Sequence, residues 1–309
     1  MKVVIADTIH PSLQNQLTEA GYHCVDCSLS SDEVFKAELA HAQILVIRSR
    51  QVIDANFIDQ FPELEMIARV GAGLEHIDVA HAKGKGIHIL SSPEGNRQAV
   101  AEHALAMLLN LFNHLNASDA EVRKGLWLRK QNEGVELQGK TVGIVGVGNT
   151  GSAFAKVISG FGVSILGYDK YKSGFEYEAT MDQLFAEADV VSLHLPMTDE
   201  THQLVNEQWL AKFKKPIYLI NTARGNLVKM EDLLSALKSG KVLGACLDVL
   251  PYETKSLKMP PLEDLPETAK TLFAQPNVLL SPHTAGLTAQ SYEKLSSILA
   301  DKIIAHYRA

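Results

Sequence analysis

The chain has little of what marks secreted, membrane-spanning or nucleic-acid-binding proteins. Three cysteines among 309 residues are too few for a framework of disulfides. No apolar run approaches the roughly 20 residues that cross a bilayer, and residues 2–7 are typical of a buried strand rather than of a signal peptide. The formal net charge of −7 argues against a basic face for DNA or RNA. We therefore expect a cytoplasmic protein whose main partners are neither membranes nor nucleic acids.

Two of the cysteines, Cys24 and Cys27, form the Cys-x-x-Cys pair that is found in redox and metal sites. They lie in the predicted strand 22–27, where positions three apart point to opposite faces. A redox pair prefers the N-terminus of a helix, and zinc would need two further ligands. We predict neither a redox pair nor a metal site, and we expect Cys246 to be a core thiol.

The sequence does contain a regular alternation of apolar strands and amphipathic helices, such as the helical stretches 11–20 and 32–40. This alternation predicts parallel sheets that are covered on both faces, and the chain is long enough for two domains. A long apolar helix is expected from 98 to about 115, as a core, inter-domain or dimer-interface helix. The predicted strands are 3–6, 44–47, 66–70, 87–90, 141–145, 164–168, 190–193, 218–221, 243–247 and 278–280.

A glycine motif, Gly-x-Gly-x-x-Gly, runs from Gly146 through Gly148 to Gly151. It follows the predicted strand 141–145 and opens a helical run, which is the setting of a dinucleotide site. Gly146 permits the tight turn, Gly148 lets the backbone approach a pyrophosphate, and Gly151 lets helix and strand pack closely. The helix start, with Asn149 and Thr150, offers free N–H groups to phosphates. A glycine turn without a nucleotide and the glycine loop of a methyltransferase are the alternatives.

The acid that follows the next predicted strand, Asp169, indicates which dinucleotide binds. Its carboxylate can accept hydrogen bonds from the ribose hydroxyls and would repel a 2′-phosphate. This favours NAD over NADP. The nearby Lys170 and Lys172 keep NADP as the less favoured alternative.

Three later segments place polar residues just after predicted strands, where open α/β sheets bind ligands. They are 221–225, 247–253 and 281–286. Together with the glycine motif, these segments resemble the D-isomer-specific 2-hydroxyacid dehydrogenase family. Segments 68–78, 101–104 and 191–196 are also similar to the family's substrate loop, connecting helix and nicotinamide-side loop, so the resemblance covers essentially the whole chain.

The resemblance implies a two-domain α/β architecture. A Rossmann NAD-binding domain, 97–287, would be inserted into a flavodoxin-like substrate-binding domain made of 1–96 and 288–309. Catalysis would take place in the cleft between the domains, and domain closure would expel water. The family is typically dimeric through the cofactor domain, so we expect a homodimer.

The resemblance also implies the catalytic roles. Arg224 would bind the substrate carboxylate and polarise the keto oxygen, for which a planar, permanently charged guanidinium is suited. His283 would be the general acid in reduction and the general base in oxidation. Glu253 would orient the imidazole and stabilise its protonated form. The expected reaction is NAD-dependent hydride transfer between nicotinamide and a small 2-hydroxy or 2-keto acid.

Further binding residues follow from the same resemblance. Asp248 would contact the nicotinamide carboxamide, and the backbone N–H groups of Ala72 and Gly73 would bind the substrate carboxylate. The remaining cofactor contacts expected are His194, Pro196, Thr222, Ala223 and His283, and the remaining substrate contacts are Arg48, Ser49 and Gly71.

The substrate itself is suggested by Arg48-Ser49-Arg50, because two arginines suit a phosphate. We therefore favour D-3-phosphoglycerate dehydrogenase activity, in serine biosynthesis, with glyoxylate or hydroxypyruvate reduction as the alternative. A non-catalytic NAD-sensing protein, similar to corepressors on this scaffold, is the alternative from another class. No regulatory domain is expected after Ala309. Thr254 replaces the proline that often follows the catalytic glutamate in the family, and the segment 255–275 is long. We therefore expect an altered loop over the site, with no catalytic atom removed.

Overall fold

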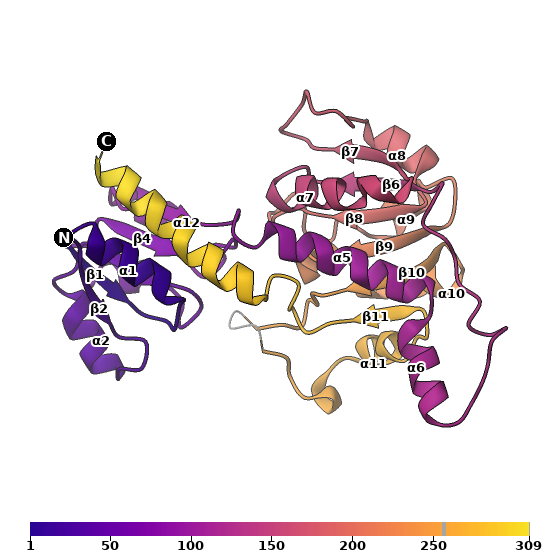
Figure 1. Cartoon of the computed structure of the whole chain (residues 1–309), viewed down its shortest axis with the longest axis horizontal. Coiled ribbons are helices and arrows are strands. Elements are labelled where there is room, and N and C mark those ends of the chain that lie inside the picture. The colour runs from indigo at the N-terminus through magenta and orange to yellow at the C-terminus, as the bar shows by residue number, and fades with distance from the viewer. Residues whose placement is uncertain (255–257, 309) are drawn as a thin grey trace. The chain divides into compact units, whose positions relative to one another are not determined.

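The computed structural model describes residues 1–254 and 258–308, and the chain divides into two compact units (Figure 1). Unit 1 comprises Met1–Arg97, Thr254–Lys258 and Leu287–Ala309, and unit 2 comprises Gln98–Glu253 and Met259–Gly286. Residues 255–257, the start of the predicted long segment, lie outside the described residues. Each unit is built on a parallel sheet with helices on both faces, which confirms the predicted fold class.

The sheet of unit 1 has five parallel strands in the order β2-β1-β3-β4-β5, the order of flavodoxin-like sheets. Alternate strand residues face opposite ways, so Val3 and Ile5 pack with one helix layer while Val4 packs with the other. The strands are β1 (Lys2–Ile5), β2 (His23–Asp26), β3 (Ile44–Ile47), β4 (Met66–Arg69) and β5 (His88–Ser91).

Helices from the two ends of the chain cover one face of this sheet. α1 (Pro11–Glu19) buries Leu13 and Leu17, and α12 (Ala289–Arg308) buries Leu295 and Leu299, each pair four residues apart on one side of its helix. Figure 1 shows α1 and α12 side by side over the strands. The other face is covered by α2 (Asp32–Leu39), α3 (Ala55–Ile58) and α4 (Val79–Gly84).

The cysteine pair is divided between these two layers. Cys24 packs with the core under α1 and α12, whereas Cys27 lies in the core on the opposite face. Burial raises the pKa of both thiols. The strand geometry that the sequence indicates therefore separates the two sulfur atoms.

The sheet of unit 2 has six parallel strands in the order β11-β10-β9-β8-β6-β7. One face is covered by α5 (Arg97–Phe112) and α7 (Asn149–Ile158). The other is covered by α8 (Met181–Glu187), α9 (Glu207–Ala211), α10 (Met230–Lys238) and α11 (Glu267–Phe273). The strands are β6 (Thr141–Val145), β7 (Ser164–Tyr168), β8 (Val190–Leu193), β9 (Ile217–Asn221), β10 (Val242–Leu247) and β11 (Val278–Leu280).

The long apolar helix ends earlier than predicted. α5 stops at Phe112, His114 adopts a left-handed φ of 51°, and a separate helix α6 (Leu115–Arg123) begins. The polar Asn113 and His114 interrupt the apolar side that holds α5 on the sheet, and α6 has no buried residue. The prediction of one helix to residue 115 is therefore wrong.

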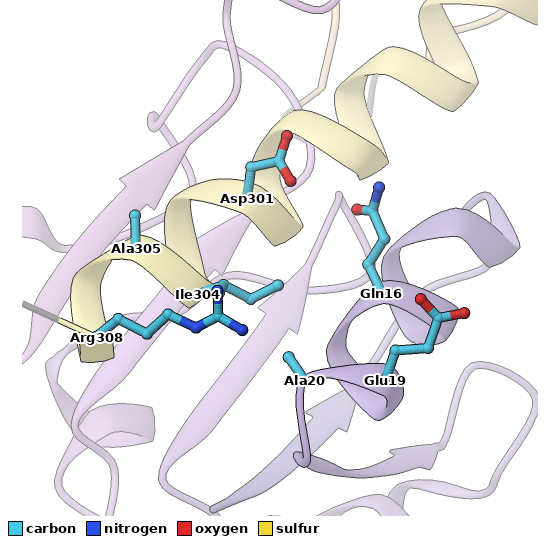
Figure 2. Close-up of a pocket in the computed structure, with 7 residues that line it drawn as sticks. All are labelled: Gln16, Glu19, Ala20, Asp301, Ile304, Ala305 and Arg308. Atoms are coloured by element: carbon cyan, nitrogen blue, oxygen red, sulfur yellow. The ribbon is translucent and has the colours of Figure 1, made fainter.

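A shallow groove separates α1 from α12 in unit 1 (Figure 2). Its lining mixes acidic, basic and aliphatic side chains and holds none of the predicted site residues: Gln16, Glu19, Ala20, Asp301, Ile304, Ala305 and Arg308. Across the described ranges, no helix has the length and apolar character that crossing a membrane requires.

In both sheets the strand order reverses beside the first strand. β1 pairs with β2 on one side and β3 on the other, and β6 pairs likewise with β7 and β8. Crevices at such reversal points are where open α/β sheets bind ligands. Two of the predicted site loops, the one after β3 in unit 1 and the one after β6 in unit 2, therefore lie at the reversal points of their sheets.

Candidate active site

The glycine motif forms a turn between β6 and α7 that only glycine permits at two places. Gly146 has a φ of 93°, and a Cβ on it would lie 2.5 Å from the carbonyl oxygen of His194. A Cβ on Gly151 would lie 2.0 Å from the carbonyl oxygen of Gly146. Gly148, in contrast, has no neighbour within 4 Å of its Cβ position, and no side chain caps α7. The open first turn of α7, with the exposed Asn149, is thus suited to a pyrophosphate.

His194 lies beneath this turn. Its Nε2 is 2.9 Å from Ser192 Oγ, its Nδ1 is 3.3 Å from Thr150 Oγ1, and its ring is 5.4 Å from that of Phe154. Burial lowers the pKa of His194 to about 3, so the imidazole is neutral. His194 therefore supports Thr150 in the first turn of α7. The exposed Pro196 accepts a hydrogen bond from Thr201 Oγ1 through its carbonyl oxygen.

Asp169 lies at the end of β7 and holds the glycine turn from the other side. Its Oδ2 accepts from the Val147 amide at 2.8 Å, and its Oδ1 accepts from the amides of Tyr171 and Lys172. Lys170 is paired with Glu200 at 2.8 Å, and Lys172 Nζ donates to the carbonyl oxygen of Val147. Both lysines that could have favoured a 2′-phosphate are thus engaged within the protein.

His283 and Glu253 form a hydrogen-bonded pair at the ends of β11 and β10. His283 Nδ1 lies 2.6 Å from Glu253 Oε2, while Glu253 Oε1 accepts from the Leu250 amide at 2.6 Å. The two side chains are 27% and 13% exposed. An ionised carboxylate can only accept, so Nδ1 donates, and Nε2 is the nitrogen left for a substrate.

The backbone of His283 is in a conformation that L-residues rarely adopt. Its φ is 54°, which costs about 1–2 kcal/mol for a residue other than glycine. The amide of His283 donates to the carbonyl oxygens of Asp248, at 2.8 Å, and Ser281, at 3.0 Å. These bonds hold the strained loop in the geometry that presents the imidazole to Glu253.

The loop that carries Arg224 packs against the loop that carries Glu253. Asn221, at the end of β9, donates to the carbonyl oxygen of Arg224 at 2.9 Å. A Cβ on Gly225 would lie 2.0 Å from the carbonyl carbon of Leu250, so only glycine allows this approach. Arg224 Nη1 donates to the carbonyl oxygen of Ala223 at 2.7 Å. The convergence of the guanidinium with the histidine–glutamate pair stays a prediction.

Thr222, beside Arg224, carries a feature that suits a ligand. The side chain is 8% exposed, yet its buried Oγ1 has no hydrogen-bond partner within the described parts of the chain. A buried polar atom of this kind usually has a partner. The neighbouring Ala223 is also buried. Thr222 and Ala223, like the glycine turn, therefore fit the predicted dinucleotide.

The carboxylate of Asp248 is occupied by the loop that carries His283. Its Oδ1 accepts from Ser281 Oγ at 2.6 Å and from the Thr284 amide at 2.9 Å, and its Oδ2 accepts from the Ala285 amide at 3.0 Å. Burial acts to raise the pKa of Asp248, but the hydrogen bonds outweigh burial and hold that pKa below its ordinary value. The predicted contact with a nicotinamide carboxamide stays a prediction.

In unit 1, Asp7 organises the loop after β3. Its Oδ2 accepts from the amides of Arg48 at 2.6 Å, Ser49 at 3.2 Å and Arg50 at 3.3 Å. The Arg48 guanidinium lies 5.7 Å from the centre of the Tyr292 ring. The loop is thus fixed through its backbone, and the Arg48 and Ser49 side chains are not needed to hold it.

The guanidinium of Arg50 is bound by backbone carbonyl groups of unit 1. Its guanidinium donates to the carbonyl oxygens of Ala6 at 3.2 Å, Cys27 at 2.8 Å and Ser30 at 2.8 Å, and it lies over the Phe35 ring. A second arginine for a phosphate was suggested by the sequence at this position. The structure gives Arg50 a stabilising role instead.

The loop after β4 contains the remaining predicted substrate contacts. Gly71 has a φ of 145°, and a Cβ on it would overlap Arg69 Nη1 at 1.2 Å. Ala72 is exposed and Gly73 is half-buried. His76 behind them is 8% exposed, and its Nε2 has no hydrogen-bond partner in the described residues. Burial and then Arg69 lower the pKa of His76, which favours the neutral ring.

Three contributors to the site lie in segments that the sequence singles out, 101–104, 191–196 and 221–225, but their roles were not predicted. Gly225 is needed for loop packing, Ser192 positions His194, and His103 contacts the loop of His283. Gly225 and His103 act on residues that are distant in the sequence, and Ser192 acts on His194 two positions away by a side-chain contact that the sequence pattern does not show.

Sequence comparisons with known proteins extend over most of the chain. Residues 105–285 match the model of the D-isomer specific 2-hydroxyacid dehydrogenase NAD-binding domain. The chain is 35% identical over 278 residues to hydroxypyruvate reductase from Thermotoga maritima, covering 89% of this chain and 88% of the relative. It is 35% identical over 309 residues to D-3-phosphoglycerate dehydrogenase from Mycobacterium tuberculosis, covering 97% of this chain. It spans 56% of that relative's length.

Solved structures with the same fold cover both units. A protein from Thermus thermophilus superposes with a TM-score of 0.81 at 30% identity, over 100% of this chain and 97% of the other. A D-lactate dehydrogenase from Treponema pallidum gives 0.83 at 27% identity, over 100% and 97%. With its NAD-binding domain matched and its whole length aligned to relatives, the chain belongs to the D-isomer specific 2-hydroxyacid dehydrogenase family.

Proposed function

We propose that the chain catalyses hydride transfer between a nicotinamide cofactor and carbon 2 of a small D-2-hydroxy or 2-keto acid. The observation that carries this proposal is the 2.6 Å hydrogen bond between His283 and Glu253 at the carboxyl ends of two neighbouring strands. Bound NADH supplies the hydride that adds to the carbonyl carbon. The protein supplies a proton, a charge partner and alignment.

His283 is the proton donor in reduction. Its Nε2–H protonates the carbonyl oxygen, which becomes the hydroxyl oxygen of the product, and the same nitrogen takes the proton back in oxidation. Because Nδ1 donates to Glu253, the carboxylate orients the ring and stabilises its positive charge. Arg224 pairs with the substrate carboxylate and stabilises negative charge that develops on the keto oxygen.

Apart from His194, which was expected to contact the cofactor directly, the other predicted contacts keep the roles that the resemblance implies. The glycine turn, with Asn149 and Thr150, binds the pyrophosphate through α7, and Asp169 binds the ribose hydroxyls. His194 acts on this site by holding Thr150. Further contacts with the cofactor would come from Pro196, Thr222, Ala223, Asp248 and His283, and contacts with the substrate from Arg48, Ser49, Gly71, Ala72, Gly73 and Arg224.

D-3-phosphoglycerate remains the substrate that we favour. D-3-phosphoglycerate dehydrogenases from several organisms align with nearly the whole chain, and Arg48 is available beside a loop held by its backbone. One observation favours the second candidate, hydroxypyruvate. Arg50 is bound to three carbonyl groups, so this loop contributes one guanidinium to a phosphate and not two.

We propose a homodimer formed through α6 and the segment that follows it. This region presents large apolar side chains to solvent: Leu115 is 53% exposed, Val122 51%, Leu126 45% and Trp127 76%. α6 buries none of its residues in its own unit. A surface of this kind is typical of a protein–protein contact, and a second copy would cover it.

A panel of keto acids tests the proposed function. Nicotinamide absorbance at 340 nm is followed with phosphohydroxypyruvate, hydroxypyruvate, glyoxylate and pyruvate, each with NADH and with NADPH. We expect turnover with NADH and the highest kcat/KM with phosphohydroxypyruvate. A higher value with hydroxypyruvate would select the second candidate. NADH binding without turnover of any acid would overturn the enzymatic proposal in favour of an NAD-sensing role.

Replacement of the proton donor separates chemistry from cofactor binding. We expect His283→Ala to lower kcat by about 10²- to 10⁴-fold, the usual contribution of general acid catalysis. The affinity for NADH, measured by fluorescence titration, should fall far less than kcat, because His283 is only one of the proposed cofactor contacts and the glycine turn and Asp169 supply others. His202→Ala, at an exposed position of the same unit, is the matched control. An equal loss of turnover and NADH affinity would contradict the assigned role.

The acid after β7 governs the choice of dinucleotide. Asp169→Asn removes the negative charge but keeps an oxygen that can accept from the loop amides. We expect the preference for NADH over NADPH, as a ratio of kcat/KM values, to fall about tenfold, or about 1.4 kcal/mol. Asp182→Asn, an exposed acid in α8, is the control. An unchanged ratio would mean that Asp169 only holds the turn.

The proposed dimer is tested by introducing negative charge into the exposed apolar surface formed by α6 and the segment that follows it. We expect the wild-type chain to sediment as a dimer and the double variant Val122→Glu/Trp127→Glu to sediment as a monomer, because two carboxylates would be buried in each half of the interface. Tyr171→Glu, at a 79% exposed position elsewhere in unit 2, should remain dimeric. A dimer that persists in the double variant would place the interface elsewhere.

A further inference from the structure

A second histidine lies behind the loop of His283. His103 comes from α5, and its Nε2 is 2.9 Å from Ser281 Oγ and 3.5 Å from Asp248 Oδ1. All of these residues belong to unit 2. His103 is 28% exposed, whereas the Asp248 side chain is 1% exposed. The ring therefore closes the outer side of a buried carboxylate.

The hydrogen atoms in this cluster can be assigned. Ser281 has one hydroxyl proton, and its Oγ lies 2.6 Å from the carboxylate of Asp248, which can only accept. The hydroxyl proton therefore points to Asp248, and Ser281 Oγ must accept from His103. This requires a hydrogen on His103 Nε2 and fixes the tautomer of the neutral ring.

The series of hydrogen bonds that begins at His103 ends on the backbone of the loop that carries His283, the proposed proton donor. His103 donates to Ser281, Ser281 donates to Asp248, and Asp248 accepts from the amides of Thr284 and Ala285. His283 lies between these partners with its left-handed φ of 54°. Its own amide donates to the carbonyl oxygens of Asp248 and Ser281, so both sides of its loop are tied to the same two residues.

We propose that His103 is a positioning residue for the reaction, acting on His283 through Ser281 and Asp248. The inference rests on the proposed function, in which His283 delivers the proton. Loss of the Nε2–H donor frees Ser281 Oγ to rotate and leaves the buried Asp248 with one fewer partner. The loop then samples other conformations, and the imidazole spends less time against Glu253.

Four variants test this inference in the full-length protein. His103→Leu removes the donor, and His103→Gln restores an N–H donor without an imidazole. Ser281→Ala removes the intermediate hydroxyl. The double variant His103→Leu/Ser281→Ala tests whether the two residues act through the same series of hydrogen bonds. His202→Leu is the control for replacing a histidine of unit 2.

We expect His103→Leu and Ser281→Ala each to lower kcat about tenfold, a modest misplacement of a catalytic group, with a much smaller fall in NADH affinity, because the proposed contacts of the glycine turn and Asp169 are left in place. His103→Gln should recover most of the loss, and the double variant should be no worse than the worse single variant. Additive losses, or a fall in NADH affinity equal to the fall in kcat, would overturn the inference.

A measurement that needs no turnover separates this inference from the proposed function. In ¹⁵N spectra of histidine-labelled protein, we expect His103 as the Nε2–H tautomer. We also expect the ring signals of His283 to shift in His103→Leu but not in His103→Gln or His202→Leu. An Nδ1–H tautomer or an unmoved His283 signal would contradict the positioning role. A wild-type chain that turns over no keto acid but shows these shifts would overturn the proposed function alone.

Discussion

The hydrogen bond between His283 and Glu253 is the interaction on which the candidate site depends. A histidine that donates a proton must be oriented and must have its charge stabilised, and one carboxylate does both. The two residues are 30 positions apart and meet because β10 and β11 are parallel neighbours, with Leu247 opposite Leu280. The same strand ends place Asp248 beneath the loop of His283. Parallel pairing thus determines which side chains share the site.

Much of the fold could be predicted because its signals are local. Apolar runs bounded by turns predicted the strands, and the glycine motif predicted a strand, a turn and a helix in that order, since Gly146 and Gly151 have a steric reason to be glycine. The end of α5 was missed, because the sequence does not show where an apolar helix leaves its sheet. The two units and the site roles depend on long-range packing, which spacing does not reveal. His103 and Ser281, 178 positions apart, are the plainest example.

Arg48 and Arg50 show how a motif can mislead about chemistry. Two arginines two positions apart suggest a shared anion. Asp7, however, fixes the backbone amides of both residues, and their side chains lie in different environments, Arg48 near Tyr292 and Arg50 among backbone carbonyls. Arg50 satisfies three carbonyl oxygens and stacks on Phe35, a structural use of the guanidinium that a lysine could not reproduce. A count of the charged residues in the loop therefore overstates how many of them are available to bind an anion.

Three histidines of unit 2 have different chemistry because their partners differ. His194 is buried between hydroxyl groups without a carboxylate, so burial keeps it neutral and suits it to support the glycine turn. His283 donates directly to a carboxylate and keeps one nitrogen for a substrate. His103 contacts the carboxylate of Asp248 mainly through the hydroxyl of Ser281. This arrangement suits it to hold the loop of His283 without exchanging a proton with the substrate. The residue type is the same in all three places, so it is the hydrogen-bond partner, and not the histidine itself, that decides which chemistry each ring is suited to.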